Sequence, residues 1–204
     1  ASSDNAPLKP IAHSANGHTE YVWDEEKRKA ELLKSHEQLL QATAKGAQQC
    51  MAYLESRGLT LDTIKAFRLG YRAVGLPSTE GKQKELSVAI PWLDPKGHLI
   101  AVKYRFIDKH VYLDKDGKEQ IDRMTSRGSN KDHAFGWQAI RNTDTLYIVE
   151  GEINAMSIWQ ASTFDVLSVG SMQKMKHLPD EIIEAAKNYK RVVVWSDERE
   201  FSEA

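Results

Sequence analysis

Two carboxylates stand just after apolar segments that are typical of buried strands. Glu150 directly follows the apolar residues 146–149, and Asp197 comes two residues after the apolar residues 192–195. A short apolar run rich in β-branched residues, closed by an acid and then by a helical pattern, is typical of a parallel strand in an α/β sheet. Since right-handed crossovers bring such strand ends to one edge, we expect these two acids to lie close together.

Carboxylate oxygens from two strand ends suit a divalent cation. Mg²⁺ takes hard oxygen ligands, usually keeps several waters, and is commonly held by one or two carboxylates together with substrate phosphates. Glu150 and Asp197 therefore predict a metal site that handles phosphates, and Gly151 would let the backbone approach a phosphate closely. The alternative that stays open is a pair of ordinary strand-terminal carboxylates, one of them capping a helix.

The elements around these acids alternate regularly along residues 143–204. Strands are expected at residues 146–149, 166–169 and 192–195, and helices at about 153–161 and 179–188. This order predicts that Glu150, Gly170 and Asp197 lie at one sheet edge. Trp195 ends what should be a central strand and is expected in the core, and Trp92 is also expected to pack inside.

The first part of the chain predicts a different architecture. Residues 1–22 are small and polar and indicate a flexible arm, and residues 23–142 form an α+β unit that is helical over 23–70 and strand-rich over 86–125. Residues 94–97 (DPKG) predict a turn. In the alternating strand after it, Lys103 and Arg105 share one face, and residues 126–132 read as a polar loop.

Composition narrows the class of protein. The net charge of −1 gives no global signal for nucleic acid, but residues 96–133 hold nine Lys/Arg against six Asp/Glu, a local excess of three positive charges. The single cysteine, Cys50, excludes an internal disulfide and indicates a buried structural thiol. No apolar run is long enough to span a membrane, so we expect a cytoplasmic or nucleoid-associated protein with no membrane contact.

An ordered series of motifs resembles the catalytic core of Toprim-containing DNA primases of bacterial and phage type. The Toprim part of the resemblance lies in EGEINA (150–155), SVGS (168–171) and VVWSD (193–197). The primase part lies upstream, in YLESRGL (53–59), DPKG (94–97), VKYR (102–105), GSNK (128–131) and AFGW (134–137). The resemblance runs from about Cys50 to the end of the chain.

The resemblance implies a fold, an activity and a set of roles. It implies an α+β subdomain followed by a Rossmann-like α/β Toprim subdomain that synthesises short RNA primers on single-stranded DNA from nucleoside triphosphates. Glu150 would be the acid/base or a metal ligand, and the acidic motif that begins at Asp197 would bind Mg²⁺ or Mn²⁺. Lys103, Arg105 and Lys131 would hold the template or the nucleotide, and Lys174 could contact phosphate or belong to a solvated loop. A replicative helicase, fused or separate, is the implied partner.

The sequence departs from the family motif at its acidic end. Arg199 stands where the family carries a second aspartate, and Asn154 stands where many relatives carry aspartate. Glu198 and Glu200 are the candidate replacements among the metal ligands, because arginine cannot ligate a cation. The chain also stops at Ala204, earlier than a Toprim domain closes, which indicates a truncated fragment or a degenerate copy.

Three functions follow from these motifs. The leading hypothesis is a primase core that performs metal-assisted nucleotidyl transfer, with Glu150 and Asp197 at its centre. The second is a catalytically degenerate Toprim module that binds nucleic acid or adapts other replisome proteins, which Arg199 and the early end of the chain motivate. The third is a Toprim nuclease, against which the primase-like upstream segments argue.

Overall fold

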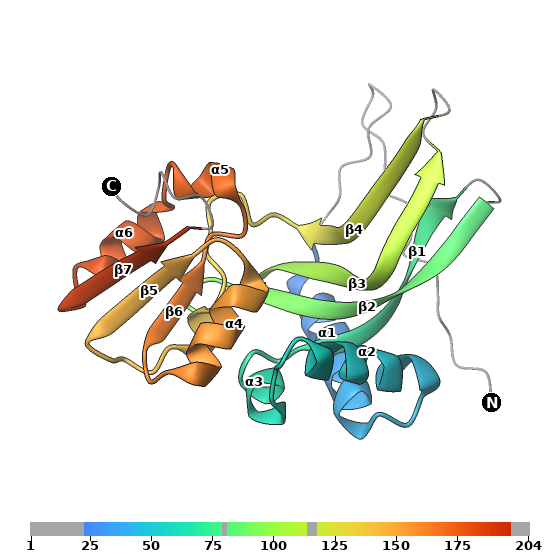
Figure 1. Cartoon of the computed structure of the whole chain (residues 1–204), viewed down its shortest axis with the longest axis horizontal. Helices are drawn as coiled ribbons and strands as arrows, with labels where there is room; N and C mark the ends of the chain where they lie inside the picture. The colour runs from blue at the N-terminus through green and yellow to red at the C-terminus, as the bar shows by residue number, and fades with distance from the viewer. Residues whose placement is uncertain (1–22, 79–80, 114–117, 197–204) are drawn as a thin grey trace.

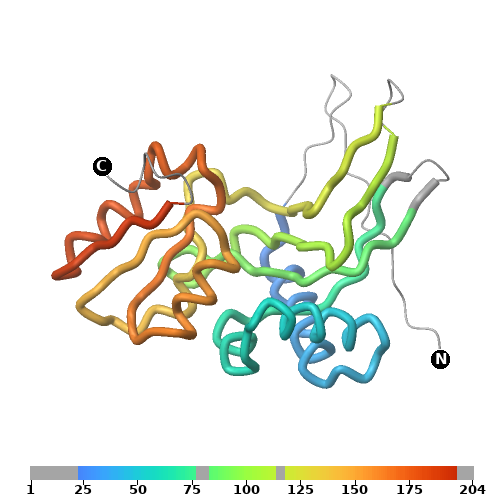
Figure 2. Tube along the Cα trace, viewed as in Figure 1, coloured from blue at the N-terminus to red at the C-terminus, as the bar shows by residue number. Residues whose placement is uncertain are grey.

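Two β-sheets lie next to each other in the computed structural model, which describes residues 23–78, 81–113 and 118–196 (Figures 1 and 2). The first sheet has four antiparallel strands in the order β1-β2-β3-β4, and the second has three parallel strands in the order β6-β5-β7. Helices α1 and α2 pack on the first sheet, α3 contacts α4, and α4, α5 and α6 belong to the second sheet (Figure 1).

Three capped helices open the described chain. Helix α1 (Glu25–Gln41) begins at Asp24, whose side chain accepts a hydrogen bond from the backbone N–H of Lys27. Helix α2 (Lys45–Ser56) follows directly, and Gly58 at φ +76° closes the unit in the left-handed region that favours glycine. Thr60 then caps α3 (Leu61–Ala66), because its side chain accepts a hydrogen bond from the N–H of Thr63.

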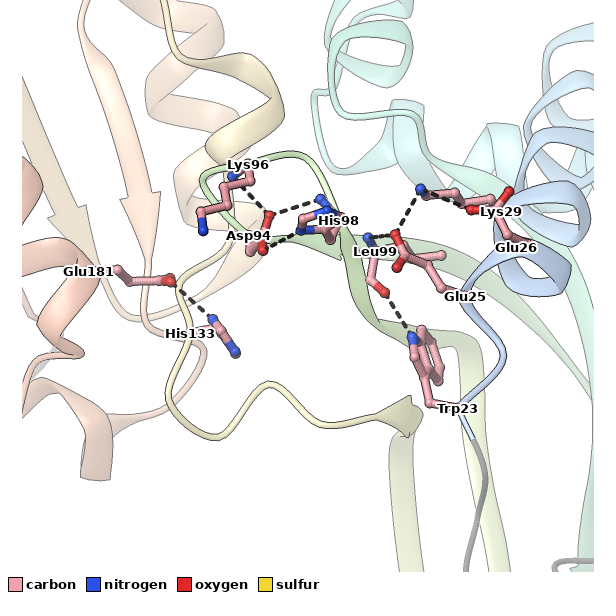
Figure 3. Close-up of polar contacts among 10 residues, drawn as sticks. All are labelled: Trp23, Glu25, Glu26, Lys29, Asp94, Lys96, His98, Leu99, His133 and Glu181. Atoms are coloured by element: carbon pink, nitrogen blue, oxygen red, sulfur yellow. Dashed lines mark hydrogen bonds and ion pairs between the residues drawn. The ribbon is translucent and has the colours of Figure 1, made fainter.

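The antiparallel sheet is a meander. Its strands are β1 (Gly70–Ser78), β2 (Gly81–Leu93), β3 (Leu99–Leu113) and β4 (Glu119–Gly128). The predicted turn between β2 and β3 is confirmed, because Asp94 Oδ1 accepts from the N–H groups of Lys96 and His98, both at 2.8 Å (Figure 3). The polar loop expected at residues 126–132 is partly wrong, because residues 126–128 pair with β3 and extend β4.

The start of β3 is fastened to the start of α1. The indole N–H of Trp23 donates to the carbonyl of Leu99 at 2.8 Å, and the N–H of Leu99 donates to the Glu25 carboxylate at 3.0 Å (Figure 3). Lys29 pairs with Glu25 at 2.8 Å, and this hydrogen bond is the main cause that lowers the pKa of Glu25. These contacts hold α1 across one face of the antiparallel sheet.

Both faces of the antiparallel sheet are covered along the first half of β3, whereas β4 is largely exposed. On one face, Val102, Tyr104 and Phe106 are buried with partly buried residues of α1 and the segment before it. On the other face, Ala101 joins the main core, which contains Trp92, Phe67 and Phe135. Lys103 and Arg105 alternate with the first set, so they lie on this second face, which meets the parallel sheet.

The parallel half follows the predicted order of strand, helix, strand, helix, strand. Its elements are η1 (Trp137–Ala139), β5 (Thr145–Val149), α4 (Glu152–Ala161), β6 (Asp165–Ser168), α5 (Met172–Met175), α6 (Asp180–Ala186) and β7 (Arg191–Trp195). The expectation that Trp195 ends a central strand in the core is wrong. Strand β7 pairs only with β5 among the described strands, and Trp195 is 55% exposed. Period and composition identify a strand but not its place in the sheet.

A buried aspartate ties the parallel half together. Asp165 is fully buried at the start of β6 and accepts hydrogen bonds from the N–H of Arg141 at 2.5 Å, the N–H of Thr143 at 2.8 Å and the hydroxyl of Tyr189 at 3.0 Å. Burial is the main cause that raises the pKa of Tyr189, and the hydrogen bond and the charge of Asp165 raise it further.

Replacing Asp165 with asparagine should lower the free energy of unfolding by about 2 kcal/mol, because an amide NH₂ would face donors that now share two carboxylate oxygens. Urea denaturation measures this loss. Asp144→Asn is the matched control: its carboxylate is exposed and pairs with Lys190, so its loss should stay within about 1 kcal/mol. Equal losses in the two variants would contradict the role given to Asp165.

The single cysteine is a core residue, as predicted. Cys50 is fully buried in α2, its thiol lies 3.5 Å from the carbonyl oxygen of Ser87, and burial raises its pKa to about 12. The thiolate is the reactive form, so Cys50 should resist a thiol reagent at pH 8 in the native protein and react fully in urea. Rapid labelling of the native protein would show that the α2 contact opens readily.

No helix in residues 23–78, 81–113 or 118–196 is long and apolar enough to cross a membrane.

Candidate active site at the joint of the two sheets

The ends of β5 and β7 meet at one edge, as the sequence predicts. Val149 pairs with Trp195 in the parallel register, so Glu150 and Ser196 are the residues that leave the two strands together. Asp197 is the next residue, but Asp197, Glu198 and Glu200 lie outside the described residues, as does Arg199. The pairing of the Glu150 and Asp197 carboxylates therefore stays a prediction that the register of these strands favours.

The loop after β6 lies against the backbone of Glu150. The carbonyl of Glu150 accepts hydrogen bonds from the N–H of Gly170 at 2.7 Å and from the hydroxyl of Ser168 at 2.8 Å. Gly170 has φ +77°, which lets the chain turn sharply at this point. The expected proximity of Glu150 and Gly170 is thus present in the structure.

Gly170 also contacts the antiparallel sheet. We use the name Trp92 cluster for five residues that meet at this contact: Trp92, Lys103, Glu152, Gly170 and Lys174. A Cβ atom added to Gly170 would lie 2.6 Å from the ring of Trp92 and 3.0 Å from Lys103 Nζ. Lys103 Nζ lies 4.6 Å from the Trp92 ring centroid, 3.5 Å from the carbonyl of Gly170 and 2.5 Å from Glu152 Oε1. The cluster therefore joins β2 and β3 of one sheet to α4 and the β6 loop of the other.

Lys174 enters the same cluster from α5. Its Nζ lies 5.3 Å from the Trp92 ring centroid and donates to the carbonyl oxygens of Asn130 and, at 3.5 Å, His133. Burial is the main cause that lowers the pKa of Lys174, and the positive charge of Lys103 lowers it further. Two ammonium groups, one of them only partly buried, therefore face one indole ring.

A second anchor holds the segment that carries Asn130 and His133. The Glu181 carboxylate accepts from the N–H of Ala134 at 2.5 Å, from the indole N–H of Trp137 at 2.9 Å, and pairs with His133 Nδ1 at 3.0 Å. The last of these contacts crosses from the connecting segment to α6 (Figure 3). The carbonyls that receive Lys174 are thus positioned by a helix of the parallel half.

The other predicted binding residues lie in different settings. Arg105 shares the sheet face of Lys103, and its Nε is buried with no hydrogen-bond partner among the described residues. Lys131 is exposed beside Asn130. Gly151 is the residue before α4, and an added Cβ would meet nothing closer than Asn154 Nδ2 at 4.0 Å, so space for a ligand remains beside it. The structure brings Lys103 and Lys174 together, whereas Lys131 stays on the surface.

Sequence reasoning missed two members of the cluster. Trp92 is buried in the core, as predicted, but its contacts with Lys103 and Lys174 were not predicted. Glu152 had no predicted role, because Glu150 two residues earlier carried the motif. The available signal was the position of Glu152 in the first turn of a helix beside a predicted phosphate site. Its partner, 49 positions earlier in the numbering, could not be recognised from local spacing.

The described residues supply part of the donor set that a divalent cation needs. Glu150 offers hard carboxylate oxygens at the sheet edge, which fits Mg²⁺ or Mn²⁺. No group of three His, Cys, Asp or Glu side chains suited to a metal occurs within residues 23–78, 81–113 and 118–196. The acids that follow Ser196 stay the predicted further ligands of this site.

Comparison with known proteins finds relatives by structure. A DnaG catalytic core is similar over 88% of this chain and 64% of its own, at 15% identity and a TM-score of 0.63. A DnaG primase catalytic domain bound to single-stranded DNA is similar over 86% and 65%, at 16% identity and a TM-score of 0.54. The chain has the fold of a DNA primase catalytic core. The primase fragment of the bacteriophage T7 primase–helicase protein shares this primase fold over 74% of the chain and 56% of its own, at 18% identity and a TM-score of 0.52.

The primase likeness is one of structure alone. No protein-family model matches the chain, and no curated protein matches it in sequence. The chain spans between about half and two thirds of the length of the primase structures that it matches. At these identities the comparison establishes the primase core fold, with its antiparallel and parallel sheets.

Proposed function

We propose that this chain carries the RNA-polymerising core of a primase, which synthesises short RNA primers on single-stranded DNA. The parallel half would be its Toprim subdomain, with Glu150 as the acid/base or metal ligand. The observation that carries the proposal is the combination of a primase core fold with Glu150 at the edge where β5 and β7 end together. The primase-like motifs upstream of Glu150 favour a primase over a Toprim nuclease.

The residues divide into those at the reacting end and those that hold phosphates. Glu150, at the sheet edge, would accept or relay the proton of the attacking ribose hydroxyl. Lys103 and Lys174 would contact phosphates without reading base sequence, and Arg105 and Lys131 would extend this basic surface toward the template. A Mg²⁺ or Mn²⁺ ion held by Glu150 and Asp197, with Glu198 or Glu200, would neutralise charge on the triphosphate.

The partners follow from the same proposal. The DnaG domain named above is bound to single-stranded DNA, and the T7 fragment comes from a primase–helicase protein. We therefore infer single-stranded DNA and nucleoside triphosphates as ligands, and a replicative helicase, fused or separate, as a partner. Such a protein would work in the cytoplasm or on the nucleoid.

The test is RNA primer synthesis on single-stranded DNA, with labelled nucleoside triphosphates and with Mg²⁺ or Mn²⁺. We expect short RNA products that require both the DNA and the metal. No product under either metal, together with intact binding of single-stranded DNA and no metal uptake in calorimetry, would replace the proposal with a nucleic-acid-binding adaptor. Cleavage of the DNA without nucleotides would replace it with a nuclease.

A further inference from the structure

Glu152 neutralises a lysine that a phosphate would otherwise bind. Its Oε1 lies 2.5 Å from Lys103 Nζ, and the two side chains are only 10% and 12% exposed. Oε1 is buried and makes no hydrogen bond within the described residues, so the contact is an ion pair without hydrogen-bond geometry. A carboxylate held by charge alone is easier to exchange for another anion than one fixed by several donors.

The positive charge around this carboxylate exceeds what Glu152 alone balances at close range. Lys103 and Lys174 both lie against the Trp92 ring, and the positive charge of Lys103 lowers the pKa of Lys174. Asp132, Glu152 and Glu181 act on Lys174 in the opposite direction. The Glu181 carboxylate is already engaged by Ala134, Trp137 and His133, whereas Glu152 is in direct contact with Lys103.

The geometry favours replacement over addition. Two ammonium groups that lie beside one indole ring can bind a phosphate, because lysine interacts with phosphate as a point charge. Because the side chain of Lys103 is only 12% exposed and Gly170 closes the other side of the ring, little room remains beside Glu152. An incoming phosphate would therefore take the place of the carboxylate.

We propose that Glu152 is an internal counter-ion that occupies a phosphate position at Lys103 and Lys174 until the triphosphate of an incoming nucleotide displaces it. The inference rests on the proposed use of this joint by nucleoside triphosphates. Glu152 would then lower the affinity for triphosphate and favour its release, and it would be a positioning residue for Lys103 that need not touch the reacting atoms.

The test is calorimetric titration with inorganic tripolyphosphate in the absence of divalent metal. The Glu152→Gln variant should bind tripolyphosphate about tenfold more tightly than the unaltered protein, because the competing negative charge is gone and the side-chain volume is kept. Glu184→Gln is the matched control, since Glu184 also pairs with a lysine, Lys187, but on the exposed surface of α6. This control should leave the affinity unchanged.

A second pair of variants tests whether the gain in tripolyphosphate affinity depends on Lys103. Lys103→Gln should weaken tripolyphosphate binding at least about tenfold, since it removes one of the two cations. Adding Glu152→Gln to Lys103→Gln should then give no further gain, because the competition requires both partners. A gain of the same size in the double variant would overturn the proposal.

Thermal unfolding separates a counter-ion from a purely structural ion pair. Glu152→Gln should unfold at a lower temperature than the unaltered protein, and tripolyphosphate should raise its midpoint more than that of the unaltered protein. Affinity that falls or stays the same in folded Glu152→Gln protein would overturn the proposal. Tripolyphosphate binding and thermal unfolding depend neither on a metal nor on Glu150. Absence of primer synthesis would therefore contradict the proposed function but would not contradict the role given to Glu152.

Discussion

Replacing Glu150 with glutamine should reduce primer synthesis at least about 100-fold, because a neutral amide neither accepts a proton nor ligates a hard cation well. Glutamine keeps the size of the side chain, and the backbone carbonyl that accepts from Gly170 and Ser168 is unaffected. The loss should therefore appear in turnover, measured as labelled RNA formed per enzyme on single-stranded DNA.

The comparison variant for Glu150 is Glu55→Gln, which changes an exposed acid in α2 and should retain full synthesis. Circular dichroism of Glu150→Gln, together with its binding of single-stranded DNA, shows whether the fold and the basic surface persist. Synthesis at the level of the unaltered protein would remove Glu150 from the reaction and leave the metal at this sheet edge without its central ligand.

Replacing Gly170 with valine should lower the free energy of unfolding by about 4 kcal/mol. Two costs add. At φ +77° a β-branched residue is strained, and its Cβ would lie 2.6 Å from Trp92, whose ring is fully buried and cannot move aside. Urea denaturation followed by circular dichroism measures the loss.

Gly97→Val separates these two costs. Gly97 also has a positive φ, +86°, but an added Cβ there meets nothing within 4 Å. Its loss should be about 1–2 kcal/mol, from backbone strain alone. If the two valine variants lose the same free energy, then the contact of Gly170 with Trp92 does not stabilise the joint of the two sheets.

Most helices and strands of this protein can be predicted from local sequence patterns. The apolar runs at residues 146–149, 166–169 and 192–195 predict β5, β6 and β7 to within a residue, because the pattern of apolar side chains is a local property. The antiparallel strand carrying Lys103 was also found, with its side chains on the correct faces.

The contacts between the two sheets cannot be predicted from local patterns. The contact of Lys103 with Glu152 and that of Gly170 with Trp92 bring together segments that are distant along the chain, and no local spacing specifies which surfaces meet. Trp195 was misplaced for a related reason, since a run of Val and Trp looks alike in a central and in an edge strand. The acids from Asp197 onward lie outside the described residues, so their part of the candidate site stays a prediction.

The position of the Trp92 cluster also has a consequence for how the protein is made. A ribosome delivers β2 and β3, with Trp92 and Lys103, long before it delivers Gly170, which is 67 residues beyond Lys103. Translation proceeds at about 5–20 residues per second, so this face of the sheet would stay exposed for several seconds before the residues that bury it are synthesised. During that interval the emerging polypeptide would present a bare indole ring, which is the kind of surface that nascent-chain chaperones retain.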